Sequence, residues 1–130
     1  MGYCYEYDPN LEAAQVAVLR TTVGWDARIE RYQRILGNTY LCVACFLEDE
    51  LVGYVDVVSD GVDDAYIRDL MVNPEHQHRN IGSTLIGMVI DRVKPSGIKM
   101  LSVLFEPWET DLYVQAGFNV MSGGEIDFEA

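Results

Sequence analysis

A strand, a polar loop and a helix follow one another between residues 66 and 93, and this segment restricts the fold more than any other. Tyr66–Val72 is a nearly continuous apolar run, which is typical of a buried strand. The period then changes to that of a helix, whose apolar stripe consists of Ile81, Leu85, Val89 and Val93. We therefore expect a strand that ends near residue 72 and a helix that begins near residue 81.

The start of this helix has the features of an anion site. The first N–H groups of a helix have no partner inside the helix and lie at the positive end of its dipole. Gly82, Ser83 and Thr84 leave room for a ligand to approach the backbone, and Arg79 adds a positive charge. The segment therefore predicts a site for a phosphate or pyrophosphate group.

The order of residues in the same segment resembles the acetyl-CoA signature of the GNAT superfamily of N-acetyltransferases. The matching pattern is Val-x-Pro-Glu-x-Gln-x-Arg-x-Ile-Gly, and a later match, Tyr-x-x-x-Gly-Phe, begins at Tyr113. The resemblance extends from about residue 3 to residue 128. Asn80 stands where the family usually has glycine, and asparagine is the non-glycine residue that best tolerates a positive φ. We therefore expect the turn before the helix to persist.

The resemblance implies acetyl-CoA as co-substrate. Backbone groups of Leu70, Met71 and Val72 would pair with its pantetheine arm like an added strand. The residues implied to hold its phosphates are Gln77, His78, Arg79, Asn80, Ile81, Gly82, Ser83 and Thr84. Because the coenzyme is anionic and the chain has few cations, we also expect Lys94 or Lys99 to lie near Arg79.

The transfer itself needs a proton donor and a proton acceptor. The resemblance gives the role of acid to Tyr113, which would protonate the leaving thiolate. Asp69 and Glu106 are the candidates for the base, with Asp56 and Tyr66 as further residues on strands expected to flank the reaction centre. A base is not required if the amine arrives neutral. Trp25 and Tyr32 are candidates to line the acceptor pocket.

Charge excludes one class of partner. The chain has 9 basic and 21 acidic residues and a net charge of -12, which argues against nucleic-acid binding. Such a surface attracts cationic amines or basic peptides, although solubility alone also explains it. The sequence contains no apolar run long enough to span a membrane and begins without the pattern of a signal peptide, so we expect no membrane partner and a cytoplasmic location.

No metal site is expected. Cys42 and Cys45 have the spacing C-x-x-C but fall in a predicted strand, where positions three apart point to opposite faces. His76 and His78 offer only two ligands. We expect buried, reduced thiols and histidines on an exposed loop.

The fold class is α + β, an α/β/α sandwich of the GNAT type in which about four helices cover a mixed, mostly antiparallel sheet. Residues 1–130 form one domain. The other predicted elements are a strand at 3–7, helices at 11–20 and from Asp26 to Leu36, a hairpin of 39–47 and 51–59, a strand at 100–105, a short helix at 107–116, and a final hairpin of 118–121 and 125–128. The strand–helix–strand unit of 66–105 should have parallel strands.

The predicted function is transfer of an acetyl group from acetyl-CoA to a primary amine by direct attack in a ternary complex. The acceptor is a small molecule or peptide of unidentified structure, and the exposed edges of such a sheet make a homodimer one possible assembly. The alternative is a non-catalytic domain that binds or senses acyl-CoA on the same fold. Two further alternatives are a transferase for longer acyl chains and a nucleotide-binding module, which the missing Gly-Lys-Ser/Thr motif disfavours.

Overall fold

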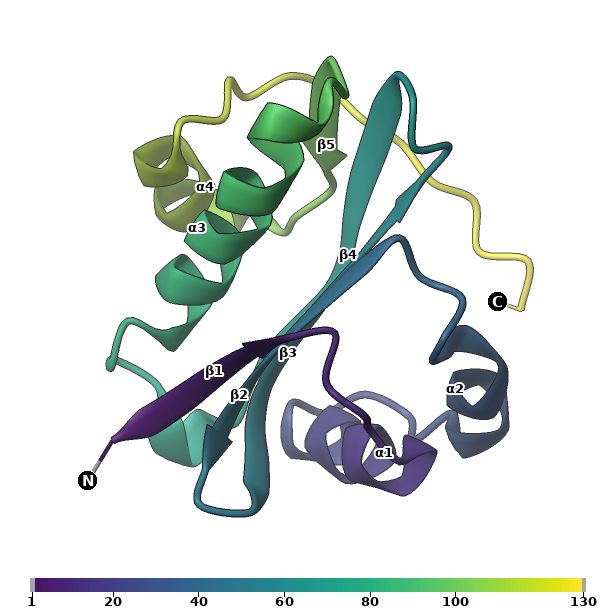
Figure 1. Ribbon diagram of the computed structural model, residues 1–130, viewed down its shortest axis with the longest axis vertical. Coiled ribbons are helices and arrows are strands. Elements are labelled where there is room, and N and C mark those ends of the chain that lie inside the picture. The colour runs from purple at the N-terminus through teal and green to yellow at the C-terminus, as the bar shows by residue number, and fades with distance from the viewer. Residues whose placement is uncertain (1, 130) are drawn as a thin grey trace.

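The computed structural model describes residues 2–129 and contains one five-stranded sheet with the order β1-β2-β3-β4-β5 (Figure 1). The strands are β1 (Tyr3–Tyr7), β2 (Leu41–Leu47), β3 (Glu50–Ser59), β4 (Asp64–Val72) and β5 (Met100–Val103). The helices are α1 (Ala13–Thr22), α2 (Ile29–Ile35), α3 (Ile81–Val93) and α4 (Thr110–Ala116), with short 3-10 turns at Pro74–His76, Lys94–Ser96 and Pro107–Glu109. Neighbouring strands are antiparallel except β4 and β5, which are parallel. The predicted mixed sheet and the parallel pair are confirmed.

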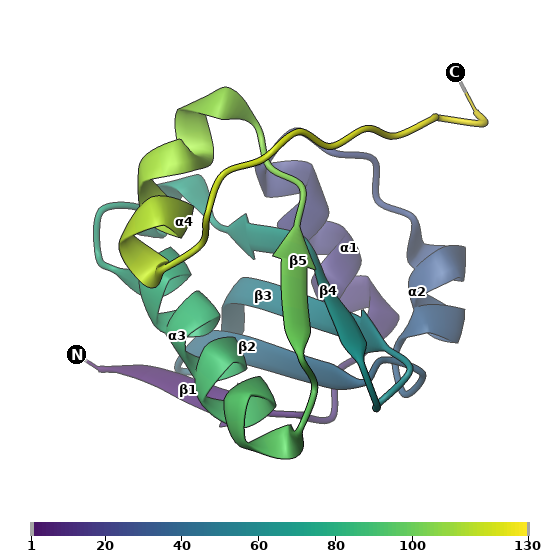
Figure 2. The same ribbon diagram turned by 90° about the horizontal axis from the view of Figure 1, so that it is seen from above.

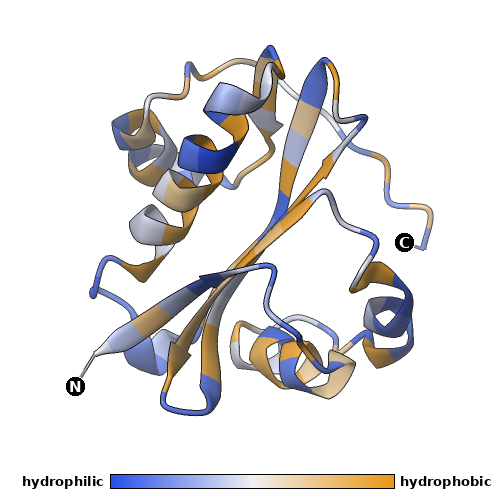
Figure 3. Cartoon of the chain, in the orientation of Figure 1, coloured by the Kyte–Doolittle hydropathy of each residue, from blue (hydrophilic) through white to orange (hydrophobic). Residues whose placement is uncertain are grey.

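Helices cover both faces of the sheet. Figure 1 shows α1 and α2 on one face and α3 and α4 on the other. Strand β2 is buried on both sides, because Cys42 and Ala44 belong to the core under α1 and α2 while Val43 and Cys45 belong to the core under α3. The hydropathy colouring of Figure 3 shows the central strands as mostly apolar. The predicted sandwich is therefore the observed one.

Helix α3 packs closely on β3, and its predicted apolar stripe is buried. A Cβ atom at Gly53 would lie 2.9 Å from Ile81 Cγ2 and 3.1 Å from Leu85 Cδ1. Real Cβ atoms do not approach other atoms so closely, so the missing side chain at Gly53 is what lets the helix start lie directly on the sheet. The position of the α3 N-terminus therefore depends on this glycine.

Strand β4 contains a bulge that the sequence did not reveal. Tyr54 pairs with Met71 and Asp56 pairs with Arg68, so two residues of β4 lie opposite one residue of β3. Asp69 is one of the two and has a φ of 54°. A bulge bends its strand and redirects side chains. The bulge therefore sets the direction of the Asp69 carboxylate.

Two predictions about the elements are wrong. Arg28, rather than Asp26, is the residue that precedes α2, and Asp26 instead forms ion pairs with Arg20 and Arg28. The predicted hairpin of 118–121 and 125–128 is absent, because residues 118–129 contain no strand. This C-terminal segment (residues 117–129) runs extended across the molecule, and Glu129 is ion-paired with Arg31 of α2 at 2.6 Å.

Among residues 2–129, no helix combines the length and the apolar character that a membrane span needs.

Candidate active site

The candidate site begins where β4 and β5 separate. The two strands pair only from Asp64 to Ile67 and from Met100 to Val103. Beyond this point the space between them is a hollow of about 540 Å³, which we call the acidic hollow. Its charged and phenolic lining residues are Asp69, Glu106, Glu109, Glu125, Arg68, Tyr66 and Tyr113.

A second hollow of about 550 Å³, the loop hollow, lies beside the first and shares Trp25, Leu70, Glu106 and Glu109 with it. It contains most of the residues implied to bind the coenzyme: Leu70, Met71, Val72, Gln77, His78, Asn80, Ile81, Gly82 and Ser83. Arg79 and Thr84 do not line it. The two hollows therefore adjoin each other, and we refer to them together as the groove.

The start of α3 presents free N–H groups to the loop hollow. Asn80 precedes the helix in the left-handed conformation, with a φ of 61°, as expected from its tolerance of positive φ. Its carbonyl oxygen accepts from the backbone N–H of Thr84 and from the hydroxyls of Ser83 and Thr84. The N–H groups of Ile81, Gly82 and Ser83 precede this first helical bond, so they remain available to an anion.

Internal packing does not require a glycine at position 82. A Cβ atom there would lie 3.8 Å from Leu112 Cδ2 and 3.9 Å from Val72 Cγ2, which are ordinary contact distances. Its φ is not in the region that favours glycine. The absent side chain therefore widens the hollow without being needed for the fold.

The expected cluster of cations at the loop is wrong. Lys94 and Lys99 lie beyond the C-terminal end of α3, whereas Arg79 lies before its N-terminus. A helix of 13 residues is roughly 20 Å long. Of the three expected cations, only Arg79 is close to the loop.

Tyr113 reaches the acidic hollow from the apolar core. Its ring stacks on Phe105 at 4.6 Å and meets the edge of Phe118 at 5.6 Å between centroids. The residue is 2% exposed, and its hydroxyl has no hydrogen-bond partner in the described part of the chain. No described polar side-chain atom is both sealed from solvent and unbonded, so the hydroxyl opens into the hollow.

The surroundings of Tyr113 keep it protonated. Burial raises the pKa of its hydroxyl, and the nearby carboxylate of Glu109 raises that pKa further. A phenol that stays protonated at neutral pH can donate a proton to a developing anion.

Asp69 is fixed by donors from three sides. Its Oδ2 accepts from Tyr32 Oη and from Arg20 Nη1 at 3.1 Å, and it lies 3.4 Å from Arg68 Nη2. Its side chain nevertheless retains 26% exposure and lines the acidic hollow. The network thus holds a negative charge at the wall of the hollow.

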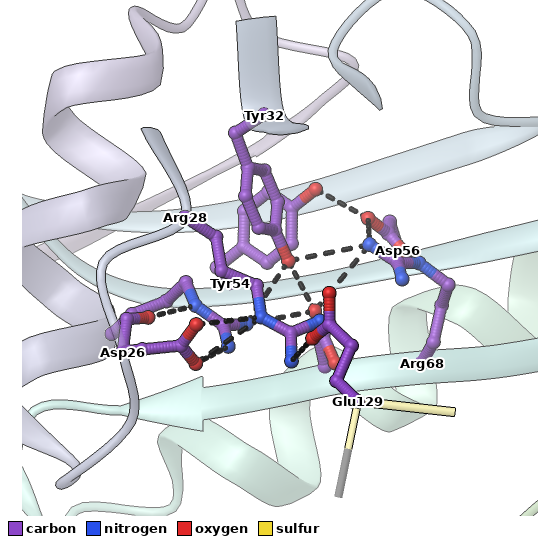
Figure 4. Close-up of polar contacts among 9 residues, drawn as sticks. Asp26, Arg28, Tyr32, Tyr54, Asp56, Arg68 and Glu129 are labelled. Carbon is purple, nitrogen blue, oxygen red and sulfur yellow. Dashed lines mark hydrogen bonds and ion pairs between the residues drawn. The ribbon is translucent and has the colours of Figure 1, made fainter. Parts of the chain in front are cut away.

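The predicted base candidate Asp56 is not in the site. It is fully buried and accepts from Arg68 Nε at 2.6 Å and from Tyr54 Oη at 2.5 Å (Figure 4). It lines neither hollow. Burial raises the pKa of its carboxyl, while the Arg68 guanidinium opposes that rise. Asp56 therefore belongs to the structural network behind Asp69.

Glu106 and Tyr66 differ in their settings. Glu106 is exposed, lines both hollows and has no ion-pair partner within residues 2–129. Burial raises the pKa of Tyr66, and the carboxylates of Glu125 and Asp69 act in the same direction. Of the two, Glu106 is the group placed to exchange protons with solvent.

The buried cysteines and His76 make contacts within the fold. Cys42 and Cys45 are buried free thiols, and burial raises the pKa of Cys42 to about 12, so this thiol stays uncharged. His76 Nδ1 lies 2.9 Å from the hydroxyl of Tyr3, so this histidine contacts β1. Within residues 2–129, no group of three or more His, Cys, Asp or Glu side chains could hold a metal ion.

Several lining residues escaped the sequence analysis. Glu109 and the run Gly123–Glu125 line the acidic hollow, and Trp108 and Gln115 line the loop hollow. No spacing pattern links Glu125 to Asp69, because the C-terminal segment reaches the hollow only through its path across the fold. Trp25 lines both hollows as anticipated, whereas Tyr32 is completely buried and lines neither.

Comparison with known sequences gives consistent results. A model of the acetyltransferase (GNAT) family matches residues 10–118. An uncharacterized N-acetyltransferase, ycf52-like, of Prochlorococcus marinus is 27% identical over 119 residues, which cover 88% of this chain and 66% of the relative. An uncharacterized N-acetyltransferase ycf52 of Pyropia yezoensis is 24% identical, with 84% and 66% of the two chains covered. The chain therefore spans about two thirds of the length of these relatives.

Comparison with solved structures shows the same fold. A probable acetyltransferase of unknown function from Staphylococcus aureus gives a TM-score of 0.87 at 21% identity, with 98% of this chain and 100% of that chain covered. An acetyltransferase of the GNAT family from Streptococcus pneumoniae gives a TM-score of 0.81 at 22% identity, with 98% of both chains covered.

Proposed function

The chain belongs to the GNAT acetyltransferase family, and on this premise we propose that it transfers an acetyl group from acetyl-CoA to a primary amine by direct attack in a ternary complex. The observation that carries the proposal is the unbonded hydroxyl of Tyr113, which opens into the acidic hollow, while the start of α3 with its free N–H groups lines the adjoining loop hollow. A proton donor and an anion site thus meet in one groove.

The residues of the loop hollow suit the coenzyme. The N–H groups of Ile81, Gly82 and Ser83 would hold its phosphates, and the space at Gly82 admits them. Beyond Ile67, β4 has no β5 partner, so backbone groups of Leu70 to Val72 that face away from β3 are open to the pantetheine arm. One of these N–H groups would polarise the thioester carbonyl as an oxyanion donor.

The acid and base roles follow from the settings of the side chains. The amine nitrogen attacks the thioester carbon, the C–S bond breaks, and Tyr113 protonates the thiolate that leaves. We assign the removal of the amine proton to Glu106 through water, because Glu106 has no ion-pair partner in the described chain and faces both hollows. Asp69, whose Oδ2 is already engaged by Arg20 and Tyr32, acts by charge on the acceptor.

Thermal unfolding with and without acetyl-CoA tests the coenzyme site, with ATP as the control ligand. Acetyl-CoA at about 100 times its Kd should stabilise the protein by roughly 2.7 kcal/mol, which raises Tm by several degrees. A transferase should also release free thiol when an amine is added, whereas a non-catalytic acyl-CoA sensor should show only the rise in Tm. If acetyl-CoA does not raise Tm, both the transferase and the sensor are contradicted.

A matched pair of glycines in α3 sharpens the test. Gly82→Val places methyl groups in the loop hollow, whereas Gly87→Val places them in open space on the same helix. We expect Gly82→Val to weaken acetyl-CoA binding at least tenfold, measured by calorimetry, and Gly87→Val to bind normally. Equal affinities would remove the start of α3 from the coenzyme site.

The oligomeric state and the cellular location of the protein remain predictions. The edge strands of the sheet are β1 and β5, so a homodimer formed through an edge is the predicted assembly, which light scattering tests. A cytoplasmic location remains the prediction from the sequence.

A further inference from the structure

We propose that the acidic hollow selects an acceptor with a second positive charge, a small diamine or polyamine, whose distal ammonium is held by Glu125 and Asp69. The inference rests on the proposed acetyl transfer and names the substrate class of the same site. It also gives the C-terminal segment a role, because that segment supplies Glu125.

The charge of the lining is strongly one-sided. Four carboxylates face the acidic hollow, from Asp69, Glu106, Glu109 and Glu125, against one cationic side chain, Arg68. The guanidinium of Arg68 is already engaged, with Nε 2.6 Å and Nη2 3.3 Å from the carboxylate of Asp56. Asp69 is paired with Arg20, but Glu106, Glu109 and Glu125 have no ion-pair partner within residues 2–129. An acceptor with one charge therefore leaves part of this negative field unmatched, whereas a diamine matches two sites at once.

The side chain of Tyr113 gives a second indication that a ligand enters. Tyr113 is 2% exposed, and its Oη, which has no partner among the described residues, opens into the hollow. A phenolic hydroxyl can donate one hydrogen bond and accept others, so this hydroxyl can pair with a molecule in the hollow. A reacting group that sits in the hollow would supply this partner.

The carboxylates reach the hollow from two groups of elements. Glu106 and Glu109 come from the 3-10 turn before α4, the helix that bears Tyr113, and we call their side the first end. Asp69 comes from β4 and Glu125 from the C-terminal segment, and we call their side the second end. The first end contains the proposed acid and, at Glu106, the proposed base. At the second end, Asp69 Oδ2 is engaged by Arg20 and Tyr32, whereas Glu125 has no ion-pair partner within residues 2–129, so Glu125 is the carboxylate available to hold a charge that does not react.

The C-terminal segment closes the second end. Gly123 to Glu125 line the hollow, and Glu129 contacts Arg31 at 2.6 Å and Arg28 at 3.7 Å. Figure 2 shows this segment passing from α4 over the end of β5 toward the side of α1 and α2. A segment across the hollow restricts the space for a protein chain, so we infer a small acceptor instead of a basic peptide.

The first test compares two acceptors of the same length. 1,4-Diaminobutane and n-pentylamine differ in that an ammonium replaces a methyl group at the distal end. At saturating acetyl-CoA, with thiol release as the readout, we expect kcat/KM for the diamine to exceed that for the monoamine at least tenfold. Equal values, or a higher kcat/KM for a lysine-containing peptide, would overturn the inference while leaving acetyl transfer intact.

The second test assigns the selectivity to Glu125. Glu125→Gln should reduce the ratio of the two kcat/KM values severalfold and leave kcat/KM for n-pentylamine nearly unchanged. Asp111→Asn is the control, because Asp111 is an exposed carboxylate of α4 that lines neither hollow. An identical ratio in both variants would contradict the role of Glu125. Absence of thiol release with every amine, together with no Tm rise with acetyl-CoA, would instead remove the proposed function.

Discussion

The two faces of the sheet are built from different chemistry. The face under α3 and α4 is covered by an almost entirely apolar cluster, in which Leu85, Ile86 and Val89 are completely buried. The face under α1 and α2 contains a connected set of charged and phenolic groups, in which Arg20 is 4% and Asp56 is 0% exposed (Figure 4). Both faces contribute to the groove, because Trp25, which follows α1, lines both hollows and Tyr113 of α4 lines the acidic hollow.

The contrast shows how one sheet supports two tasks. An apolar contact has no preferred direction, but it places the start of α3 firmly on the strands and so positions the N–H groups of the loop hollow. A polar network is directional, and it holds the Asp69 carboxylate of the β4 bulge at the wall of the acidic hollow. The five predictions below test this division.

The largest effect on stability should come from Arg68→Met. The substitution leaves the carboxylate of Asp56 buried without its cation, and loss of one partner of a buried pair costs roughly 3–5 kcal/mol. Urea unfolding at about pH 7.5 measures it. Asp56→Asn should cost less, because Arg68 remains partly exposed and close to Asp69.

The stability of Arg68→Met should also depend on pH in a distinct way. Burial already raises the pKa of Asp56 above its unfolded value, so protonation favours the folded state, and this stabilisation is lost as pH rises through the folded pKa. Removal of Arg68 raises that pKa further. The deficit of Arg68→Met should therefore shrink on acidification to about pH 5, and a deficit that does not change with pH would contradict the buried charge.

Tyr113→Phe should lower kcat roughly 100-fold with little change in acetyl-CoA affinity, because it removes the proposed acid and keeps the stacked ring. Stability should stay within about 0.5 kcal/mol, since the hydroxyl has no protein partner to lose in the described chain. Assays of free-thiol release at saturating substrates measure kcat. Tyr40→Phe, outside both hollows, is the control, and full activity of Tyr113→Phe would exclude Tyr113 as the acid.

Gly53→Ala tests the apolar face by overpacking. Its new methyl group would meet Ile81 Cγ2 at 2.9 Å and Cys45 Cβ at 3.2 Å, which predicts a loss of about 1–3 kcal/mol. Displacement of the α3 start should also weaken acetyl-CoA binding. Gly87→Ala, which adds a methyl group in open space, should instead gain up to about 1 kcal/mol, so similar stabilities of the two variants would argue against close packing at Gly53.

The smallest effect should come from Asn80→Gly, for which Asn80→Ala is the comparison. In Asn80→Ala, a residue that has a Cβ atom but no polar side chain must adopt a φ of 61°, which should lower the free energy of unfolding by about 1–2 kcal/mol. Asn80→Gly should leave stability and acetyl-CoA affinity nearly unchanged, because the Asn80 side chain does not cap the helix. A marked loss of affinity in Asn80→Gly, measured by calorimetry, would assign the amide a contact with the coenzyme.

The sequence predicted the parts of the fold that depend on local periodicity. The α3 boundaries, the hairpin of β2 and β3 and the opposite faces of Cys42 and Cys45 follow from spacings of about four and two residues. The prediction of an anion site at the start of α3 has the same local basis, since the unpaired N–H groups belong to any helix. These features need no distant partner, so a single segment specifies them.

Only the tertiary structure decided how the acidic hollow is assembled. Asp69 faces the hollow because of a bulge that appears only when β4 pairs with β3, and Glu125 arrives because its segment crosses the fold instead of folding back as a hairpin. Asp56 was a candidate base by sequence and became a buried partner of Arg68 for the same reason. Strand register and long-range ion pairs join residues that no sequence spacing relates. The amino-acid sequence by itself therefore determined the family resemblance and the prediction of an anion site, while the folded chain determined which carboxylates surround Tyr113.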